Sequence, residues 1–196
     1  MARCPACGCL ERHRLAWLVL GRHTDLFDGA PKRLLHVAPE RALEGRLRAL
    51  PGIEYVSADL TDRRAMLNFD VTKIPLSDHS FDALICSHVL EHVPDDRAAM
   101  RELARVVKPS GWAIIEVPPL LDGVTFEDPS VQSPRERARL FGQHDHVRVP
   151  GHDYPRRLEE NGWLVGRIRG RDLSREEITR LGLHAEEDVF LCRPAA

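Results

Sequence analysis

Histidine and arginine side chains gather in one short stretch of this 196-residue sequence. His144, His146 and Arg148 lie two, four and six residues after a glycine, Gly142. An imidazole changes charge near neutral pH and can take a proton from a nucleophile, whereas a guanidinium can bind a carboxylate or a phosphate. We therefore expect His144, His146 and Arg148 to be catalytic, with Tyr154 as a further anion-binding group. The alternative interpretation is a solvated loop.

A second stretch places two imidazoles four residues apart, at His88 and His92. Residues at this spacing share one face of a helix. His88 and His92 are therefore alternative catalytic residues, and Glu91 or Asp145 could orient such a ring. The competing interpretation, which we prefer for this pair, is the start of a helix in which a satisfied histidine lies beneath a bound cofactor.

The N-terminal cysteines are a candidate metal site. Cys4 and Cys7 form one half of a zinc-binding signature, to which Cys9, His13 or the histidines of the later loop could add ligands. The alternative is a set of ordinary free thiols.

Two aspartates follow apolar segments that are typical of buried strands. Asp59 comes about 20 residues after Ala38, the offset at which an acidic side chain binds the ribose in nucleotide-binding βαβ units. Asp70 follows the next short apolar segment and could accept a hydrogen bond from an adenine amino group. The alternative is that both carboxylates only cap the elements that follow. We favour the nucleoside, because several strand ends agree.

The elements that position these residues alternate along the chain. Strands are expected over 32–38, 54–58, 66–71, 81–86, 112–117, 163–168 and 188–192, and helices over 11–21, 41–50, 97–107 and 154–161, with Pro39 and Glu40 in the first turn of the second helix. This alternation predicts an α/β fold with a mostly parallel sheet and helices on both faces. The polar segment 120–155 breaks the rhythm and is expected to form a lid or pocket loop, with a helix around Arg135–Arg139.

Three segments carry a resemblance to a known family. LLHVAPE, VSADL and FDALICSHVLEHVPDDRAAMRELARVVKPSGWAIIEVP resemble the class I S-adenosylmethionine-dependent methyltransferases of the small-molecule type. CPACGCLERHR and FGQHDHVRVPGHDY look like marks of a bacterial subgroup of these enzymes. The resemblance implies a Rossmann-like, doubly wound seven-stranded sheet whose last strand is antiparallel. It also implies in-line methyl transfer from S-adenosyl-L-methionine to O or N of a small-molecule or peptide acceptor.

The resemblance also implies where the cofactor binds. The residues that it places there are His36, Val37, Ala38, Pro39, Glu40, Asp59, Leu60, Asp70, Val71, Ser87 and His88. The family's glycine-rich first loop is absent, since no glycine occurs between His36 and Gly45. Ala38 is small enough for close approach, but Pro39 removes a backbone donor. The segment around Glu11–Arg14 could cover the same pocket.

We expect a single methyltransferase domain over residues 1–196. Its parts are an N-terminal cysteine-containing cap and helix (1–30), a cofactor-binding core (31–118), an inserted substrate or lid loop (119–157) and C-terminal helix and strands (158–196). A non-catalytic cofactor- or zinc-binding regulatory module of the same fold is the alternative function. A dinucleotide oxidoreductase is disfavoured, because no G-x-G-x-x-G follows the first strand.

Charge and composition limit the partners. The net charge of −2 creates no field that would attract nucleic acid or an anionic membrane. Arg135, Arg137 and Arg139 have no aromatic neighbours for stacking bases. The apolar runs are too short to span a bilayer. With no secretory signal at the start and an odd number of cysteines, five, we expect a cytoplasmic protein.

Overall fold

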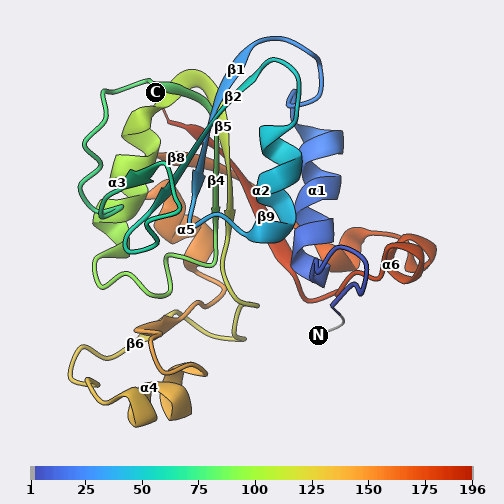
Figure 1. Ribbon diagram of the computed structural model, residues 1–196. Coiled ribbons are helices and arrows are strands. Elements are labelled where there is room, and N and C mark those ends of the chain that lie inside the picture. Colours follow the sequence, from blue (N-terminus) through green and yellow to red (C-terminus); the bar gives the residue numbers. More distant parts are fainter. Residues whose placement is uncertain (1–2, 196) are drawn as a thin grey trace.

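The computed structural model describes residues 3–195, and its centre is a seven-stranded sheet with the order β3-β2-β1-β4-β5-β9-β8 (Figure 1). The strands are β1 Lys32–Val37, β2 Ile53–Asp59, β3 Leu67–Asn68, β4 Phe81–Ser87, β5 Val107–Glu116, β8 Trp163–Arg169 and β9 Asp188–Pro194. The first five pair in parallel, whereas β9 runs antiparallel to both β5 and β8. The predicted mostly parallel sheet with an antiparallel last strand is confirmed.

Strand register decides which residues meet at one edge of this sheet. Val37 of β1 lies opposite Ala58 of β2 and Cys86 of β4. Because these strands are parallel, the residues that come next in each strand, among them Ala38 and Asp59, leave the sheet at the same edge. This is the edge at which open α/β sheets bind their ligands.

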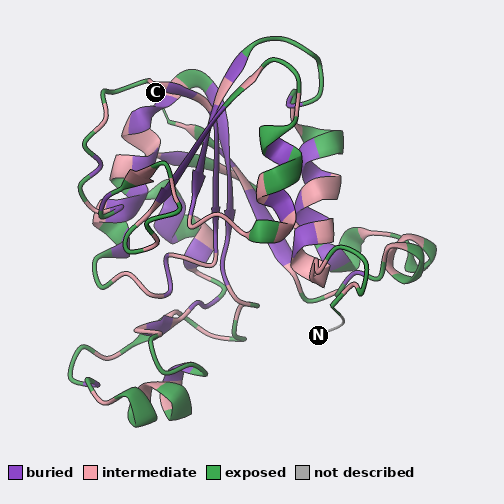
Figure 2. Ribbon diagram, in the orientation of Figure 1, coloured by how far each residue is buried: buried purple, intermediate pink, exposed green. Residues whose placement is uncertain are grey.

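Helices cover both faces of the sheet. They are α1 Glu11–His23, α2 Arg41–Arg48, α3 Asp96–Val106, α4 Pro134–Phe141, α5 Tyr154–Glu159 and α6 Arg175–Leu181. Figure 1 shows α1 and α2 on one face and α3 and α5 on the other. Two cores result: Leu15 and Leu47 belong to the first, and Met100 and Leu158 to the second. The central strands β1 and β4 between them are almost wholly buried (Figure 2).

Much of the expected insert folds into a small unit beyond the carboxyl ends of the strands (Figure 1). Its two strands, β6 Phe126–Glu127 and β7 Arg148–Val149, pair antiparallel. The intervening α4 has Pro134 in its first turn, where an amide lacks an intrahelical acceptor in any case. It ends at Gly142, whose φ of 84° is left-handed and suits glycine. This unit is mostly exposed (Figure 2).

Some boundaries differ from expectation. The expected strand 66–71 is only two residues long, because the chain turns at Asp70, which accepts from the amide of Thr72. β5 begins at Val107 instead of residue 112, and a register shift against β4 absorbs the intervening residues. Glu40 is the N-cap of α2 and lies before its first turn.

Helix α6 was not anticipated, because none of its residues is fully buried and its apolar face consists of Ile178 and Leu181 alone. Its signal is the capping box of Ser174 and Glu177. No helix within residues 3–195 combines the length and the apolar character that crossing a bilayer requires.

Candidate functional site

A cavity of about 470 Å³ opens at the carboxyl ends of β1, β2 and β4. This volume is in the range of small-molecule and cofactor sites. The residues that line it are Val37, Ala38, Asp59, Leu60, Thr61, Asp70, Val71, Thr72, His88, Val89, His92, Val93, Pro94 and Asp145. Seven of the eleven residues predicted to bind the cofactor are in this set, and Asp145 comes from the insert.

The aspartates at one end of the cavity each commit one oxygen to a turn. Oδ1 of Asp59 accepts from the amides of Thr61 and Asp62, at 2.8 and 2.7 Å. Oδ1 of Asp70 accepts from the amide and the hydroxyl of Thr72, both at 2.8 Å. Among the described residues nothing is bonded to either Oδ2. The two interpretations of these aspartates, as caps and as ligand-binding groups, are therefore compatible.

The backbone is left-handed at two positions on the cavity wall. Ala38, directly after β1, has a φ of 49°, and His88, directly after β4, has a φ of 53°. For a residue other than glycine this conformation costs about 1–2 kcal/mol, and such strain clusters at ligand sites. Ala38 thus adopts the left-handed conformation that a glycine would adopt without strain.

Four of the predicted cofactor residues do not line the cavity: His36, Pro39, Glu40 and Ser87. His36 is fully buried, with Nδ1 3.0 Å from Oη of Tyr55 and Nε2 3.4 Å from Oε2 of Glu40. Ser87 donates to Oε1 of Glu40 at 2.9 Å. The expectation that they contact the cofactor is corrected, since their side chains bond one another or, for Pro39, line a separate small hollow.

Glu40 is the centre of this neighbouring cluster. Burial raises the pKa of Glu40, but the bonds with His13 and His36 outweigh burial and hold its pKa well below the ordinary value. The nearby Glu116, at the end of β5, shows the opposite. Its burial and the charge of Glu40 raise the pKa of Glu116 well above that of an ordinary carboxyl. The pKa values of these two carboxyls are therefore shifted in opposite directions.

Imidazoles gather at the other end of the cavity. His88 and His92 line it together with Asp145. Nδ1 of His88 lies 3.2 Å from Oε1 of Glu91, and Nδ1 of His92 lies 3.4 Å from Oδ2 of Asp145. The ring of His146 meets the edge of the His92 ring, with 4.7 Å between the centroids. These contacts fit the expectation that Glu91 and Asp145 orient histidines.

The segment that carries these residues is not a helix. Residues 88–94 form a turn, and α3 begins only at Asp96. His88 and His92 therefore do not share a helical face, contrary to the prediction. His88 Nε2 is buried without a hydrogen-bond partner among the described residues, and so are both carboxylate oxygens of Glu91. Unsatisfied buried polar atoms are uncommon in proteins and often mark a place where a ligand or an ion binds.

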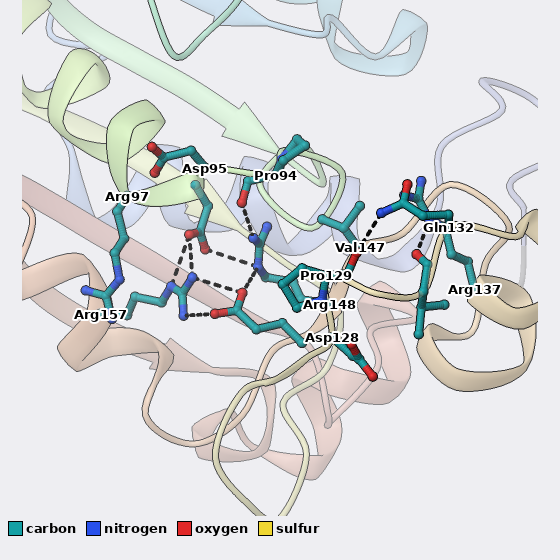
Figure 3. Close-up of a pocket in the computed structure, with 13 residues that line it drawn as sticks. Pro94, Asp95, Arg97, Asp128, Pro129, Gln132, Arg137, Val147, Arg148 and Arg157 are labelled. Carbon is teal, nitrogen blue, oxygen red and sulfur yellow. Dashed lines mark hydrogen bonds and ion pairs between the residues drawn. The ribbon is translucent and has the colours of Figure 1, made fainter.

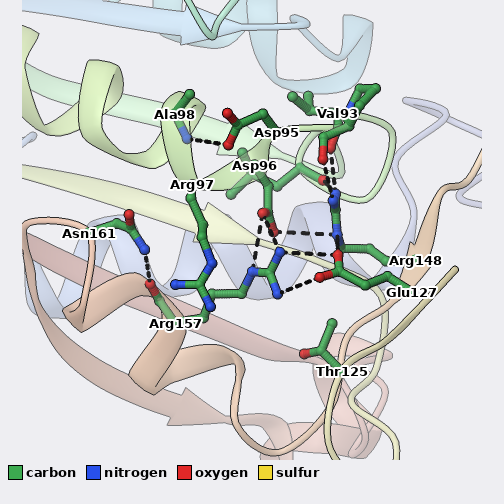
Figure 4. A network of polar contacts seen from close by, with 12 residues as sticks. Val93, Asp95, Asp96, Arg97, Ala98, Thr125, Glu127, Arg148, Arg157 and Asn161 are labelled. Carbon is green, nitrogen blue, oxygen red and sulfur yellow. Dashed lines mark hydrogen bonds and ion pairs between the residues drawn. The ribbon is translucent and has the colours of Figure 1, made fainter. Parts of the chain in front are cut away.

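Arg148 is 2% exposed, and its guanidinium bonds the protein itself (Figures 3 and 4). Its Nη atoms donate to the carbonyl oxygens of Leu90, Val93 and Pro94, at 2.6, 2.6 and 2.9 Å. Its Nε donates to Glu127 at 2.9 Å. The prediction that Arg148 contacts a substrate does not fit this burial, and its role is to hold the turn 90–94.

The prediction that Tyr154 binds an anion does not fit the structure either. It is fully buried and donates to Oδ2 of Asp96 at 3.1 Å. Arg157 joins the same network through Asp96 and Glu127 (Figure 4). A hollow of about 400 Å³ lies beside this network (Figure 3). Its charged groups largely pair with one another, so we place the functional site in the cavity at the strand ends.

The remaining predicted histidine, His144, points into solvent. Its side chain is 72% exposed, and its contact with Asp145 is long, at 3.8 Å. His144 does not line the cavity. Exposure without a positioning contact does not suit a catalytic group. His146 does not line the cavity either, but its ring contacts that of His92, which does.

The N-terminal cysteines do come together. Ligand atoms of Cys4, Cys7 and Cys9 all lie within 4.8 Å of one another, which suits a thiolate-bound metal. His13, the suggested fourth ligand, does not join them. Its Nδ1 accepts from the amide of Leu10 and its Nε2 faces Glu40 at 3.4 Å.

A comparison with known families identifies what the core of the chain is similar to. Residues 35–115 match the family described as the methyltransferase domain. This segment of the chain is therefore similar to a methyltransferase domain. The matched segment runs from β1 to β5 and contains every residue that lines the cavity except Asp145 of the insert.

A curated relative of the chain carries a methyltransferase name as well. The demethylmenaquinone methyltransferase of Clavibacter sepedonicus is 31% identical over 100 residues, which are 44% of this chain. The chain covers 41% of that relative's length.

Two solved structures have the same fold. An S-adenosylmethionine-dependent methyltransferase from Mesorhizobium loti has a TM-score of 0.64 at 14% identity, covering 90% of this chain and 96% of that one. The [4+2]-cyclase SpnF has a TM-score of 0.62 at 17% identity, covering 93% of this chain and 81% of that one. At these identities the likeness establishes the fold, and the cyclase shows that the fold does not fix the reaction.

Several residues at the cavity were not predicted from the sequence. Thr61 and Thr72 line the cavity, and their signal is their place directly beyond the strand-end aspartates. Glu91 was considered only as a partner for a histidine. Nothing in the sequence indicates that its carboxylate is wholly buried, because the insert that covers it folds back from more than fifty residues later in the chain.

Proposed function

We propose that this chain is an S-adenosyl-L-methionine-dependent methyltransferase that methylates O or N of a small-molecule or peptide acceptor. The observation that carries the proposal is the single cavity that joins the two strand-end aspartates to the imidazole cluster. One end of this cavity suits a nucleoside and the other suits a reacting proton donor.

Asp59 and Asp70 bind the nucleoside in this proposal. Oδ2 of Asp59 accepts from the ribose hydroxyls, and Oδ2 of Asp70 accepts from the adenine amino group. Both carboxylates are already fixed by turn bonds through Oδ1, so little conformational freedom is lost on binding. The apolar walls supplied by Leu60 and Val71 flank the base.

His88 receives the acceptor's proton in this proposal. S-adenosyl-L-methionine brings a methyl group that is already activated on a sulfonium, so the chain's task is to align the acceptor and remove its proton. Glu91 faces Nδ1 of His88 at 3.2 Å, which leaves Nε2 as the basic nitrogen. Its strained backbone, anchored by the His88 amide to the carbonyl oxygen of Glu116 at 2.9 Å, fixes the ring at the cavity wall.

Calorimetry with S-adenosylmethionine, S-adenosylhomocysteine and NADH tests this function. We expect the first two to bind and NADH not to bind. Transfer of labelled methyl groups to candidate acceptors is the second step. The name of the Clavibacter relative adds demethylmenaquinone as a comparison acceptor, since its methyl group would go to a ring carbon and not to O or N. Binding of NADH alone would overturn the proposal.

A non-catalytic cofactor- or zinc-binding module of the same fold remains the second candidate, favoured by the absence of a glycine-rich loop after the first strand. Binding of S-adenosylmethionine without methyl transfer to any acceptor would support it.

We further propose that Cys4 and Cys7, with Cys9, hold zinc at the N-terminus, on the strength of their convergence. Metal analysis of the purified chain and of a Cys7→Ser variant tests this: the variant is expected to hold about one equivalent of zinc less than the parent, and equal zinc contents would refute the site. All five cysteines of the described residues are free thiols, which supports a reducing compartment such as the cytoplasm.

A further inference from the structure

We propose that Glu91, His92 and His146 bind a divalent first-row transition-metal ion at the imidazole end of the cavity. One ligand atom from each of these residues lies within 4.8 Å of the others. Two ligands about 2.1 Å from a common ion can be at most about 4.2 Å apart, so the three groups need to close by only a fraction of an ångström. Ion binding itself does not depend on the proposed methyl transfer.

The state of Glu91 is the second, independent observation. Its side chain is 1% exposed, and neither carboxylate oxygen has a hydrogen-bond partner among the described residues. Its contact at 3.2 Å is with Nδ1 of His88, on Oε1. Burying a carboxylate without hydrogen bonds is costly, and coordination of a cation removes that cost. A carboxylate has two oxygens and can face His88 and a cation at once.

Both imidazoles are held in the form that binds metals. Nδ1 of His146 lies 3.0 Å from the carbonyl oxygen of Phe141, which can only accept, so Nδ1 carries the proton. Nδ1 of His92 faces the carboxylate of Asp145 at 3.4 Å. Nε2 of each ring is therefore the nitrogen with a free lone pair. Metal-binding histidines usually donate their other ring N–H to a carboxylate or carbonyl in this way.

The insert is fastened where it must deliver His146. The amide of Val147 donates to the carbonyl oxygen of Glu91 at 2.9 Å, which ties His146 to the turn. Arg148 then binds three carbonyl oxygens of residues 90–94 (Figure 4). We assign Arg148 as a positioning residue for this site.

The ligand set indicates the kind of ion. Two imidazoles and one carboxylate suit Zn²⁺, Co²⁺ or Fe²⁺, whereas Mg²⁺ prefers oxygen ligands. Three protein ligands leave coordination positions open, and His92 borders the cavity. An acceptor hydroxyl bound there would lose its proton more easily, with the oxygen keeping the electron pair and the proton passing to His88 or water.

Titration of the chelator-treated full chain with Co²⁺ tests the site, because Co²⁺ on nitrogen and oxygen ligands gives visible bands. Binding to the N-terminal thiolates would instead add sulfur-to-cobalt charge-transfer bands, and a Cys7→Ser background removes that contribution. We expect about one equivalent of visible-band Co²⁺ in this background. Glu91→Gln and His146→Asn should each weaken binding at least about tenfold, as in other sites that lose ligand-shell contacts. His144→Asn, the exposed neighbour, should bind like the parent.

Thermal unfolding separates ligand loss from misfolding. Co²⁺ should raise the melting temperature of the Cys7→Ser parent and of His144→Asn but not that of Glu91→Gln. Without metal, Glu91→Gln should melt no lower than the parent, since it removes an unsatisfied buried charge. Absence of visible bands in the parent, or unchanged bands in Glu91→Gln, would overturn the site and show a Glu91–His88 ion pair only. Neither result would bear on nucleoside binding.

Discussion

The two ends of the cavity are built in different ways. The nucleoside end rests on Asp59, the last residue of β2, and on Asp70, two residues after β3. Both are fixed by bonds to residues two or three positions away. The imidazole end combines a turn after β4 with His146, which comes from the insert. Local register therefore suffices for the first end, whereas the second depends on a long-range contact.

The two ends also differ in how their charges are satisfied. The aspartates of the nucleoside end are partly or fully exposed and accept backbone bonds. At the other end, Glu91 and Nε2 of His88 are buried without hydrogen-bond partners among the described residues. Exposed groups tolerate an empty site, but buried groups of this kind require a ligand or an ion to balance them.

Arg148→Met should have the largest effect of the substitutions that test the imidazole end. It removes the bonds to the carbonyl oxygens of the turn 90–94 and leaves buried Asp96 with one cation fewer. Removing one partner of a buried ion pair costs about 3–5 kcal/mol, so we expect a loss of that size in the free energy of unfolding, measured with urea. Arg156→Met, at a side chain that is 79% exposed, is the control and should change stability little. Equal stability of the two variants would refute the role of Arg148.

Asp59→Ala tests the nucleoside end alone. Loss of the charged hydrogen bonds to ribose should weaken S-adenosylhomocysteine binding by about 1.5–3 kcal/mol, measured by calorimetry. Asp62→Ala is the matched control, because Asp62 pairs with Arg64 and does not line the cavity. Co²⁺ binding should survive in both. If Asp59→Ala keeps the parent's affinity, the ribose assignment is wrong.

Ala38 offers a comparison within one position. Ala38→Val places a branched side chain on a left-handed backbone at the cavity wall, so we expect a loss of about 1–3 kcal/mol in stability together with weaker nucleoside binding. Ala38→Gly suits the backbone and should keep both. Melting curves and calorimetry on the pair decide this. Tolerance of valine would mean that the cofactor does not approach this turn.

Glu127→Gln has the smallest expected effect and sharpens the role of the insert. Burial raises the pKa of Glu127, but Arg157 and Arg148 outweigh it and lower the pKa below the ordinary value. The carboxylate therefore contributes stability above about pH 4.5, and this contribution is lost as pH falls further. Melting temperatures between pH 7 and pH 3 should fall less steeply in the variant. Parallel curves would show that the pair adds nothing.

Much of the fold could be predicted, because strands and helices alternate and each strand is an apolar run with clear ends. The segment from β4 to β5 even carries the family resemblance. Helix α6 was not predicted because only Ile178 and Leu181 pack against the core, which is too short an apolar pattern to indicate a helix. The short β3 escaped because an edge strand ends wherever turn bonds, here those of Asp70, take over.

The candidate site divides in the same way. Asp59, Asp70 and Ala38 were found from strand ends, since register alone brings them together. His36 and Arg148 were misjudged because their burial depends on partners, Tyr55 and the turn 90–94, that no spacing rule connects to them. Residue type suggested chemistry in each case, but only packing decides which side chains face the cavity.

A crystal structure of the chain with S-adenosylhomocysteine tests the central claim most directly. We expect the ribose hydroxyls to bind Asp59, the adenine amino group to lie near Asp70 and the sulfur to face His88 and His92. A nucleoside bound elsewhere, for instance in the hollow beside Arg157, or a strand edge closed by side chains, would contradict it.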